Sequence, residues 1–114
     1  QRGEIGRTYA IGGENEARNL DLVRMICAIM DDLRPAGAPH DRLITFVADR
    51  PGHDQRYAID PARINRELGW RPSVTLEEGL RKTVEWFLAN APWWQALQGR
   101  SGVGTRLGLT GAAR

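Results

Sequence analysis

Apolar residues recur at helical spacing between residues 19 and 33. The stripe comprises Leu22, Ile26, Ile29 and Leu33, and it is widened by Val23, Cys27 and Met30. Asn19 is a favourable N-cap residue, and Pro35 and Gly37 after the stripe disfavour further helix. The pattern therefore predicts an amphipathic helix of about four turns that begins at Asn19 and ends before Pro35.

A second helical stripe follows Thr75 in the last third of the chain. Thr75 and Glu78 have the spacing of a capping box, in which side chain and backbone at the helix start bond each other reciprocally. The stripe runs until Pro92 and comprises Leu76, Leu80, Val84, Phe87 and Leu88. This is the clearest helix that the sequence predicts.

A short helix and two strands complete the predicted elements. Asp60-Pro61 offers an N-cap and a proline at the first helical position, and Gly69 is placed to cap the other end of a two-turn helix. The β-prone run Arg7–Ile11 and the apolar run Leu43–Val47 are expected to be strands, the second covered on both faces. The expected fold class is α/β, with about three helices and two or more short strands.

Length and composition place the chain among ordinary globular domains. It has 114 residues, of which 41% are hydrophobic and 26% charged. No apolar run approaches the ~18 residues of a membrane span, so we expect no membrane partner. The only charged residues after position 97 are three arginines, and the overall charge of +2 therefore leaves residues 1–97 at −1. This argues against a nucleic-acid partner, and divides the chain into a domain, residues 1–97, and a Gly/Arg-rich flexible tail, residues 98–114.

The polar turn Asp49–Asp54 is the strongest candidate for a binding site. It follows an apolar run directly, and it concentrates an arginine, a histidine and two carboxylates around Pro51-Gly52, a pair suited to the centre of a type II turn. The planar guanidinium of Arg50 matches phosphate oxygens, and His53 can add a further donor. The composition favours a diphosphate ligand; the alternative is a solvated turn whose charges satisfy one another.

Other patterns of chemistry are weak. His40-Asp41 and His53-Asp54 lack the His or Cys spacing of a metal site, and Gly12-Gly13 is not part of a G-x-G-x-x-G dinucleotide loop. Ser73 and Ser101 lie outside any G-x-S-x-G nucleophile elbow. We therefore expect no metal site, no cofactor site and no catalytic residue within this chain.

Several strings of residues have a familiar order and spacing. They are Tyr9–Gly13 with Asn15, Glu16 and Asn19; Val47–Asp60, which reads V-A-D-R-P-G-H-D-Q-R-Y-A-I-D; Glu67–Pro72; and Gly79–Leu88. Over residues 3–94 they closely resemble the C-terminal part of the dTDP-glucose 4,6-dehydratases, which are nucleotide-sugar enzymes of the extended short-chain dehydrogenase/reductase superfamily. The D-R-P-G-H-D-x-R-Y-A-I-D string is the most specific of them.

The resemblance implies a fold, an activity and a set of site residues. The fold would be the C-terminal, substrate-binding portion of an extended Rossmann-type dehydrogenase. The activity would be that of a lyase of deoxysugar and rhamnose biosynthesis, which converts dTDP-glucose to dTDP-4-keto-6-deoxyglucose with loss of water. For the complete enzyme the resemblance implies NAD as cofactor, a homodimer and a cytoplasmic location. It assigns substrate binding to Asn19, Asp49, Arg50, Pro51, Gly52 and His53.

The catalytic Tyr-x-x-x-Lys pair of that family does not carry over. Tyr9 and Tyr57 are followed four residues later by Gly13 and Pro61, and the chain's one lysine is Lys82. The family's N-terminal glycine-rich NAD loop also has no counterpart. We therefore expect a fragment that is inactive alone, with NAD bound by an N-terminal part outside this sequence.

Three alternatives to this reading stay open. The first is part of another nucleotide-sugar dehydratase, epimerase or decarboxylase, which the R-P-G-H-D string disfavours. The second is a non-catalytic nucleotide-binding or assembly module, and the third is an inert truncation product. A fragment should also expose apolar residues that a missing half would cover. The expected positions are Ile44, Phe46, Trp93 and Trp94.

Overall fold

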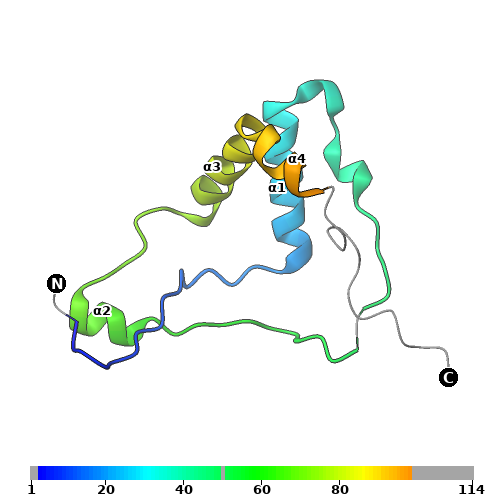
Figure 1. The fold of residues 1–114 in the computed structure, drawn as a ribbon. Coiled ribbons are helices and arrows are strands. Elements are labelled where there is room, and N and C mark those ends of the chain that lie inside the picture. The colour runs from blue at the N-terminus through cyan, green and yellow to red at the C-terminus, as the bar shows by residue number, and fades with distance from the viewer. Residues whose placement is uncertain (1–2, 50, 99–114) are drawn as a thin grey trace.

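Four α-helices, joined by extended segments, make up the computed structural model, which describes residues 3–49 and 51–98. The helices are α1 (Asn19–Leu33), α2 (Ala62–Leu68), α3 (Leu76–Ala89) and α4 (Ala91–Gln98), and short 3₁₀ turns lie at Pro35–Gly37 and His40–Leu43. Figure 1 shows α1, α3 and α4 grouped together, with α2 apart from them beside the N-terminal segment. No helix in the described ranges is long and apolar enough to cross a bilayer.

The predicted helix after residue 18 is confirmed, but its start differs from the prediction. Arg18 is the N-cap residue, Asn19 is the first helical residue, and no side chain caps the helix. The apolar stripe faces α3, and Ile29 is buried within it. Arg81 of α3 donates from Nη2 to Oδ2 of Asp32 at 2.6 Å, which adds a polar contact to this packing.

Helix α3 begins with the predicted capping box. The backbone N–H of Glu78 donates to Oγ1 of Thr75 at 3.2 Å, and the backbone N–H of Thr75 donates to Oε2 of Glu78 at 3.1 Å. These hydrogen bonds from Thr75 stabilise the carboxylate and lower the pKa of Glu78. The box satisfies two N–H donors at the start of the helix. Because its two residues have a characteristic spacing, the sequence alone locates this helix start.

The chain continues beyond α3 into a helix that the sequence pattern did not predict. Pro92 was expected only to end the preceding helix, yet it lies in the first turn of α4, where a missing N–H removes no helical hydrogen bond. Trp94 donates from Nε1 to the carbonyl of Phe87 at 2.8 Å and so ties α4 to α3.

The short helix α2 agrees with its prediction to within one residue. Oδ1 of Asp60 accepts a hydrogen bond from the backbone N–H of Ala62 at 2.8 Å, while Pro61 occupies the N-cap position. Gly69 ends the helix with φ of 69°, a left-handed conformation that favours glycine. Ile64 on this helix is 5% exposed.

The two predicted strands are wrong for the described residues. Arg7–Ile11 and Leu43–Val47 contain no strand; Leu43 closes a 3₁₀ turn, and the following residues are extended without a ladder. A strand satisfies its backbone through hydrogen bonds to a neighbouring strand, and within residues 3–49 and 51–98 no strand pairs with either run. Phe46 is accordingly 79% exposed, although its segment was expected to be covered on both faces. Of the α/β prediction, the helical part is confirmed.

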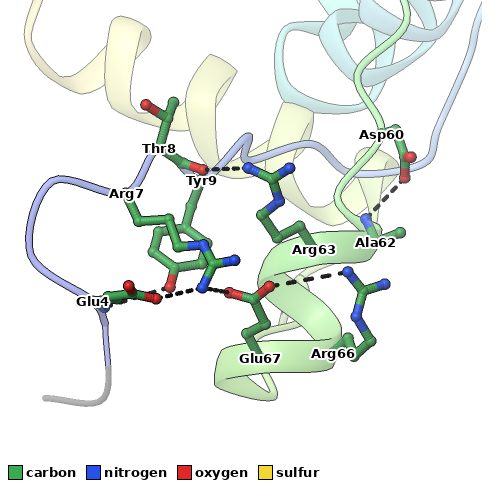
Figure 2. Close-up of polar contacts among 9 residues, drawn as sticks. All are labelled: Glu4, Arg7, Thr8, Tyr9, Asp60, Ala62, Arg63, Arg66 and Glu67. Atoms are coloured by element: carbon green, nitrogen blue, oxygen red, sulfur yellow. Dashed lines mark hydrogen bonds and ion pairs between the residues drawn. The ribbon is translucent and has the colours of Figure 1, made fainter.

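Polar contacts hold the N-terminal segment against α2 (Figure 2). Arg7 pairs with Glu4 and, at 3.6 Å, with Oε2 of Glu67 on α2. Arg63 of α2 donates from Nη1 to the carbonyl of Thr8 at 3.4 Å. These contacts are exposed, so the segment is attached mainly by long side chains at the surface.

Further along the N-terminal segment, the backbone at Gly12 comes close to Ile59, which precedes α2. A Cβ built on Gly12 would lie 2.9 Å from Cβ of Ile59 and 3.1 Å from its carbonyl oxygen. Only glycine fits at such a separation without a shift of the neighbouring segment. At Gly13, in contrast, a Cβ would meet only the Asn15 side chain at an ordinary 3.5 Å.

Little of the chain is buried. Ile29 and Ile64 are the buried hydrophobic residues among those described. The expected apolar exposure is confirmed for Phe46 and for Trp93, which is 59% exposed, and is wrong for Ile44 and Trp94, which are half-buried.

The capping box of α3 can be tested with one substitution. Thr75→Ala removes the acceptor of the Glu78 N–H and should destabilise α3 by about 1 kcal/mol. Urea unfolding followed by far-ultraviolet circular dichroism measures the change. The matched control is Thr83→Ala in the interior of α3, where alanine is the better helix former and no loss is expected. Equal losses in the two variants would contradict the role of the box.

The close approach at Gly12 gives a second test. Gly12→Ala places a methyl group against the backbone of Ile59. Overpacking of this kind costs about 1–3 kcal/mol, which exceeds the stabilisation that exposed contacts between the two segments provide. Nuclear Overhauser effects between residues 10–13 and 57–60 should therefore disappear in Gly12→Ala and persist in the matched control Gly13→Ala. Their persistence in both variants would show that the approach is looser than the structure indicates.

Candidate functional site

An open cleft of about 1310 Å³ brings together segments that are distant in the sequence. It is lined by residues 15–19, residues 45–49 and residues 53–57, together with Leu22 and Leu76. Asn19, Asp49 and His53 therefore lie around one space, although Asn19 is separated from the other two by some thirty residues. The walls combine carboxylate, guanidinium, imidazole and amide groups with the apolar side chains of Phe46 and Val47, as ligand sites commonly do.

The turn on one side of the cleft has the backbone that its sequence predicts. Gly52 adopts φ of 70°, the positive value that a glycine after proline accepts in a type II turn. Across the turn, Nδ1 of His53 lies 2.6 Å from Oδ1 of Asp49. This contact orients the imidazole so that Nε2 is directed away from Asp49. The side chain of His53 is 38% exposed and that of Asp49 is 75% exposed, so both can reach a ligand.

The start of α1 forms another part of the wall. Arg18 and Asn19 line the cleft, and no side chain caps the helix there. The N–H groups in the first turn of a helix carry a partial positive charge and lack partners within the helix. This end of α1 is therefore suited to an anionic group, and Asn19 adds an exposed side-chain amide beside it.

An ion pair links the two sides of the cleft. Nη2 of Arg56, which follows the turn, contacts Oε2 of Glu16, which precedes α1. The hydrogen bond from Arg56 lowers the pKa of Glu16, and the same contact raises the pKa of Arg56. Sequence reasoning did not single out this pair, because no regular spacing connects residues 16 and 56.

The structure brings together some of the expected site residues. Asn19, Asp49 and His53 line the cleft, whereas Pro51 and Gly52 form the turn beside it. Arg50 lies outside the described residues. Tyr57 also lines the cleft and is 69% exposed.

The other histidine, His40, forms a separate contact near the C-terminal end of α1. Nδ1 of His40 lies 2.5 Å from Oδ1 of Asp31, and the backbone N–H of His40 donates to the same oxygen at 2.8 Å. The hydrogen bonds from His40 lower the pKa of Asp31. The ring packs against Gly37, where a Cβ would come within 2.8 Å of Nε2. This pair holds the loop after α1; among the described residues no group of three metal-ligating side chains is present.

Comparison with known proteins identifies the class of protein. Residues 3–83 match the family model described as GDP-mannose 4,6 dehydratase, and the chain belongs to that family. A probable dTDP-glucose 4,6-dehydratase of Sinorhizobium fredii is 50% identical over 109 residues, and the dTDP-glucose 4,6-dehydratase of Neisseria meningitidis is 57% identical over 97 residues. The crystal structure of dTDP-glucose 4,6-dehydratase from Bacillus anthracis in complex with NAD superposes with a TM-score of 0.65 at 37% identity. The resemblance to the dTDP-glucose 4,6-dehydratases expected from the sequence is thus confirmed.

The matches cover most of this chain but a minor part of each relative. The alignments cover 96% of the chain and 31% of the Sinorhizobium protein, and 82% of the chain and 27% of the Neisseria protein. The superposition covers 78% of the chain and 26% of the Bacillus structure. The chain therefore spans about a quarter to a third of the length of its relatives.

The described residues do not fit an NAD site. Residues 7–18, which include Gly12-Gly13, are extended and open no strand–turn–helix unit, and no G-x-G-x-x-G sequence lies there. The related Bacillus enzyme was solved in complex with NAD.

The ion pair across the cleft predicts a pH dependence. Because the folded pKa of Glu16 lies below 4.5, the contact with Arg56 is present above that value and is lost as the pH falls through the lowered pKa. Arg56→Gln should return the pKa of Glu16 upward to its ordinary value, as measured by carboxyl ¹³C NMR titration. The control Arg81→Gln removes the partner of Asp32 instead, and it should leave the pKa of Glu16 unchanged. An unchanged Glu16 titration in Arg56→Gln would contradict the pairing.

Proposed function

We propose that this chain is the nucleotide-sugar-binding, C-terminal part of a dTDP-glucose 4,6-dehydratase. The observation that carries the proposal is the cleft, in which Asn19, Asp49 and His53 come together from two distant segments. These are residues that the D-R-P-G-H string and the asparagine before it assign to substrate binding by resemblance. The family membership and the named relatives support the same assignment.

The chemistry of the cleft suits a nucleoside diphosphate. The uncapped start of α1 offers N–H donors and a partial positive charge to phosphate oxygens. His53 and Arg50 add donors from the turn, and Arg50 is assigned here from the sequence because it lies outside the described residues. Asn19 can bond the nucleotide or sugar through its amide. Pro51 and Gly52 set the turn that directs these groups to one side.

In the complete enzyme the reaction would be the dehydration of dTDP-glucose to dTDP-4-keto-6-deoxyglucose. The residues of this chain would bind and orient the nucleotide end of the substrate, so that the sugar projects out of the cleft. Such positioning holds the reacting carbons in a fixed geometry, which lowers the entropic part of the activation barrier. The catalytic Tyr-x-x-x-Lys pair, the NAD site and hence the chemical steps belong to sequence outside this chain in the proposal. The proposal also includes a homodimer and a cytoplasmic location for the complete enzyme.

A non-catalytic binding module is the second candidate function. The observation that favours it is the sequence itself, which contains the substrate-binding strings without the catalytic pair. Both candidates predict nucleotide binding by the cleft, and they differ in whether the chain contributes to dehydration. Dehydratase activity in the complete protein, abolished by substitutions in the cleft, separates them.

A titration of the 114-residue chain with dTDP tests the cleft. Saturable NMR shifts confined to residues near Asn19 and His53 are expected. Asn19→Ala and His53→Ala should each raise the Kd by about five- to tenfold, which corresponds to about 1–1.5 kcal/mol for one lost hydrogen bond. Gln95→Ala, on an exposed face of α4 outside the cleft, is the control and should bind as the wild type does. Binding that all three substitutions leave unchanged would place the nucleotide elsewhere.

A further inference from the structure

Three contacts show that the segment before α1 lies beside the segment that leads into α2, and that the two run in opposite directions. Arg63 contacts Thr8, Ile59 contacts Gly12, and Arg56 contacts Glu16. As the position in one segment rises from 8 to 16, the position in the other falls from 63 to 56, which is an antiparallel arrangement. The segments 8–16 and 56–63 are thus held together by side chains and one close backbone approach.

The contact between Glu16 and Arg56 is the last of the three before the cleft. Beyond Glu16 the first segment enters α1, whose first residue is Asn19. Before Arg56 the second segment forms the turn that carries Asp49 and His53. The start of α1 and the turn therefore diverge directly after this ion pair. Glu16 and Arg56 both line the cleft.

We infer that Glu16 and Arg56 are positioning residues for the nucleotide site, because their ion pair fixes the spacing between the start of α1 and the Asp49–His53 turn. The inference rests on the proposed function of the cleft. With the pair intact, Asn19 and His53 stand at the two sides of one space before a ligand arrives. Without the pair, the ligand itself has to bring the start of α1 and the turn together. The free energy spent on this ordering weakens binding.

A direct electrostatic role for the two residues would have a different signature. Arg56 could attract phosphate by its charge, in which case the carboxylate of Glu16 competes for the guanidinium and repels the ligand. Removal of Glu16 would then strengthen dTDP binding. In the positioning role, removal of either residue weakens it. Glu16→Gln is therefore the decisive variant, since the two roles predict opposite signs.

The variants for the test are Glu16→Gln, Arg56→Gln and the charge-swapped double variant Glu16→Arg/Arg56→Glu. The control is Arg7→Gln, which removes the ion pair between the N-terminal segment and Glu67 of α2, away from the cleft. The affinity for dTDP is measured by NMR titration, and global stability by urea unfolding. Nuclear Overhauser effects between residues 16–19 and 53–57 in the ligand-free chain report the spacing between the start of α1 and the turn directly.

Each single variant in the pair should lose these Overhauser effects and bind dTDP about fivefold more weakly, the upper end of what one exposed ion pair supplies. The unfolding midpoint should stay that of the wild type, because an exposed pair contributes little to global stability. The charge-swapped variant should recover both the Overhauser effects and most of the affinity. Arg7→Gln should bind as the wild type does.

Stronger binding by Glu16→Gln, or no recovery in the charge-swapped variant, would overturn the inference. So would Overhauser effects that survive in both single variants. Failure of the proposed function gives a different result: the wild-type chain would not bind dTDP, while the Overhauser effects would still depend on the ion pair. The two ideas can therefore fail separately.

Discussion

Backbone hydrogen bonding is the constraint on which this structure depends. A helix satisfies its N–H and C=O groups within one stretch of chain, whereas a strand requires a second stretch beside it. In the described parts of the chain the regular elements are all helical, and the β-prone runs at residues 7–11 and 43–47 remain extended. Neither run is assigned as a strand in the described parts of the chain, and Leu43 closes a 3₁₀ turn.

The distribution of burial leads to the same view of the chain. The buried apolar side chains among the described residues are Ile29 of α1, a helix that packs against α3, and Ile64 of α2. Apolar residues on the extended segments stay exposed, among them Phe46, Val47 and Ile59. Both buried apolar side chains in the described residues thus lie on helices, and most of the exposed large apolar residues lie on the segments between helices.

Elements determined by local interactions could be predicted from the sequence, and elements determined by distant partners could not. The Thr75–Glu78 capping box and the left-handed Gly69 are fixed by residues within one helical turn. Helix α4 was missed because Pro92 was taken as a stop, although proline is equally suited to a first turn. The strand predictions were wrong because a β-prone sequence reports a preference for pairing and cannot supply the neighbour.

The candidate site follows the same division between local and distant interactions. The composition of residues 49–54 locates the turn, the positive φ of Gly52 and a group of donors suited to phosphate. The contact between Glu16 and Arg56 joins positions forty residues apart, and no pattern along the chain reports it. Yet this long-range pair links the segment that enters α1 at Asn19 to the segment that follows His53. The residue types of the candidate site are thus readable locally, whereas the long-range contact beside it can be seen only in the folded chain.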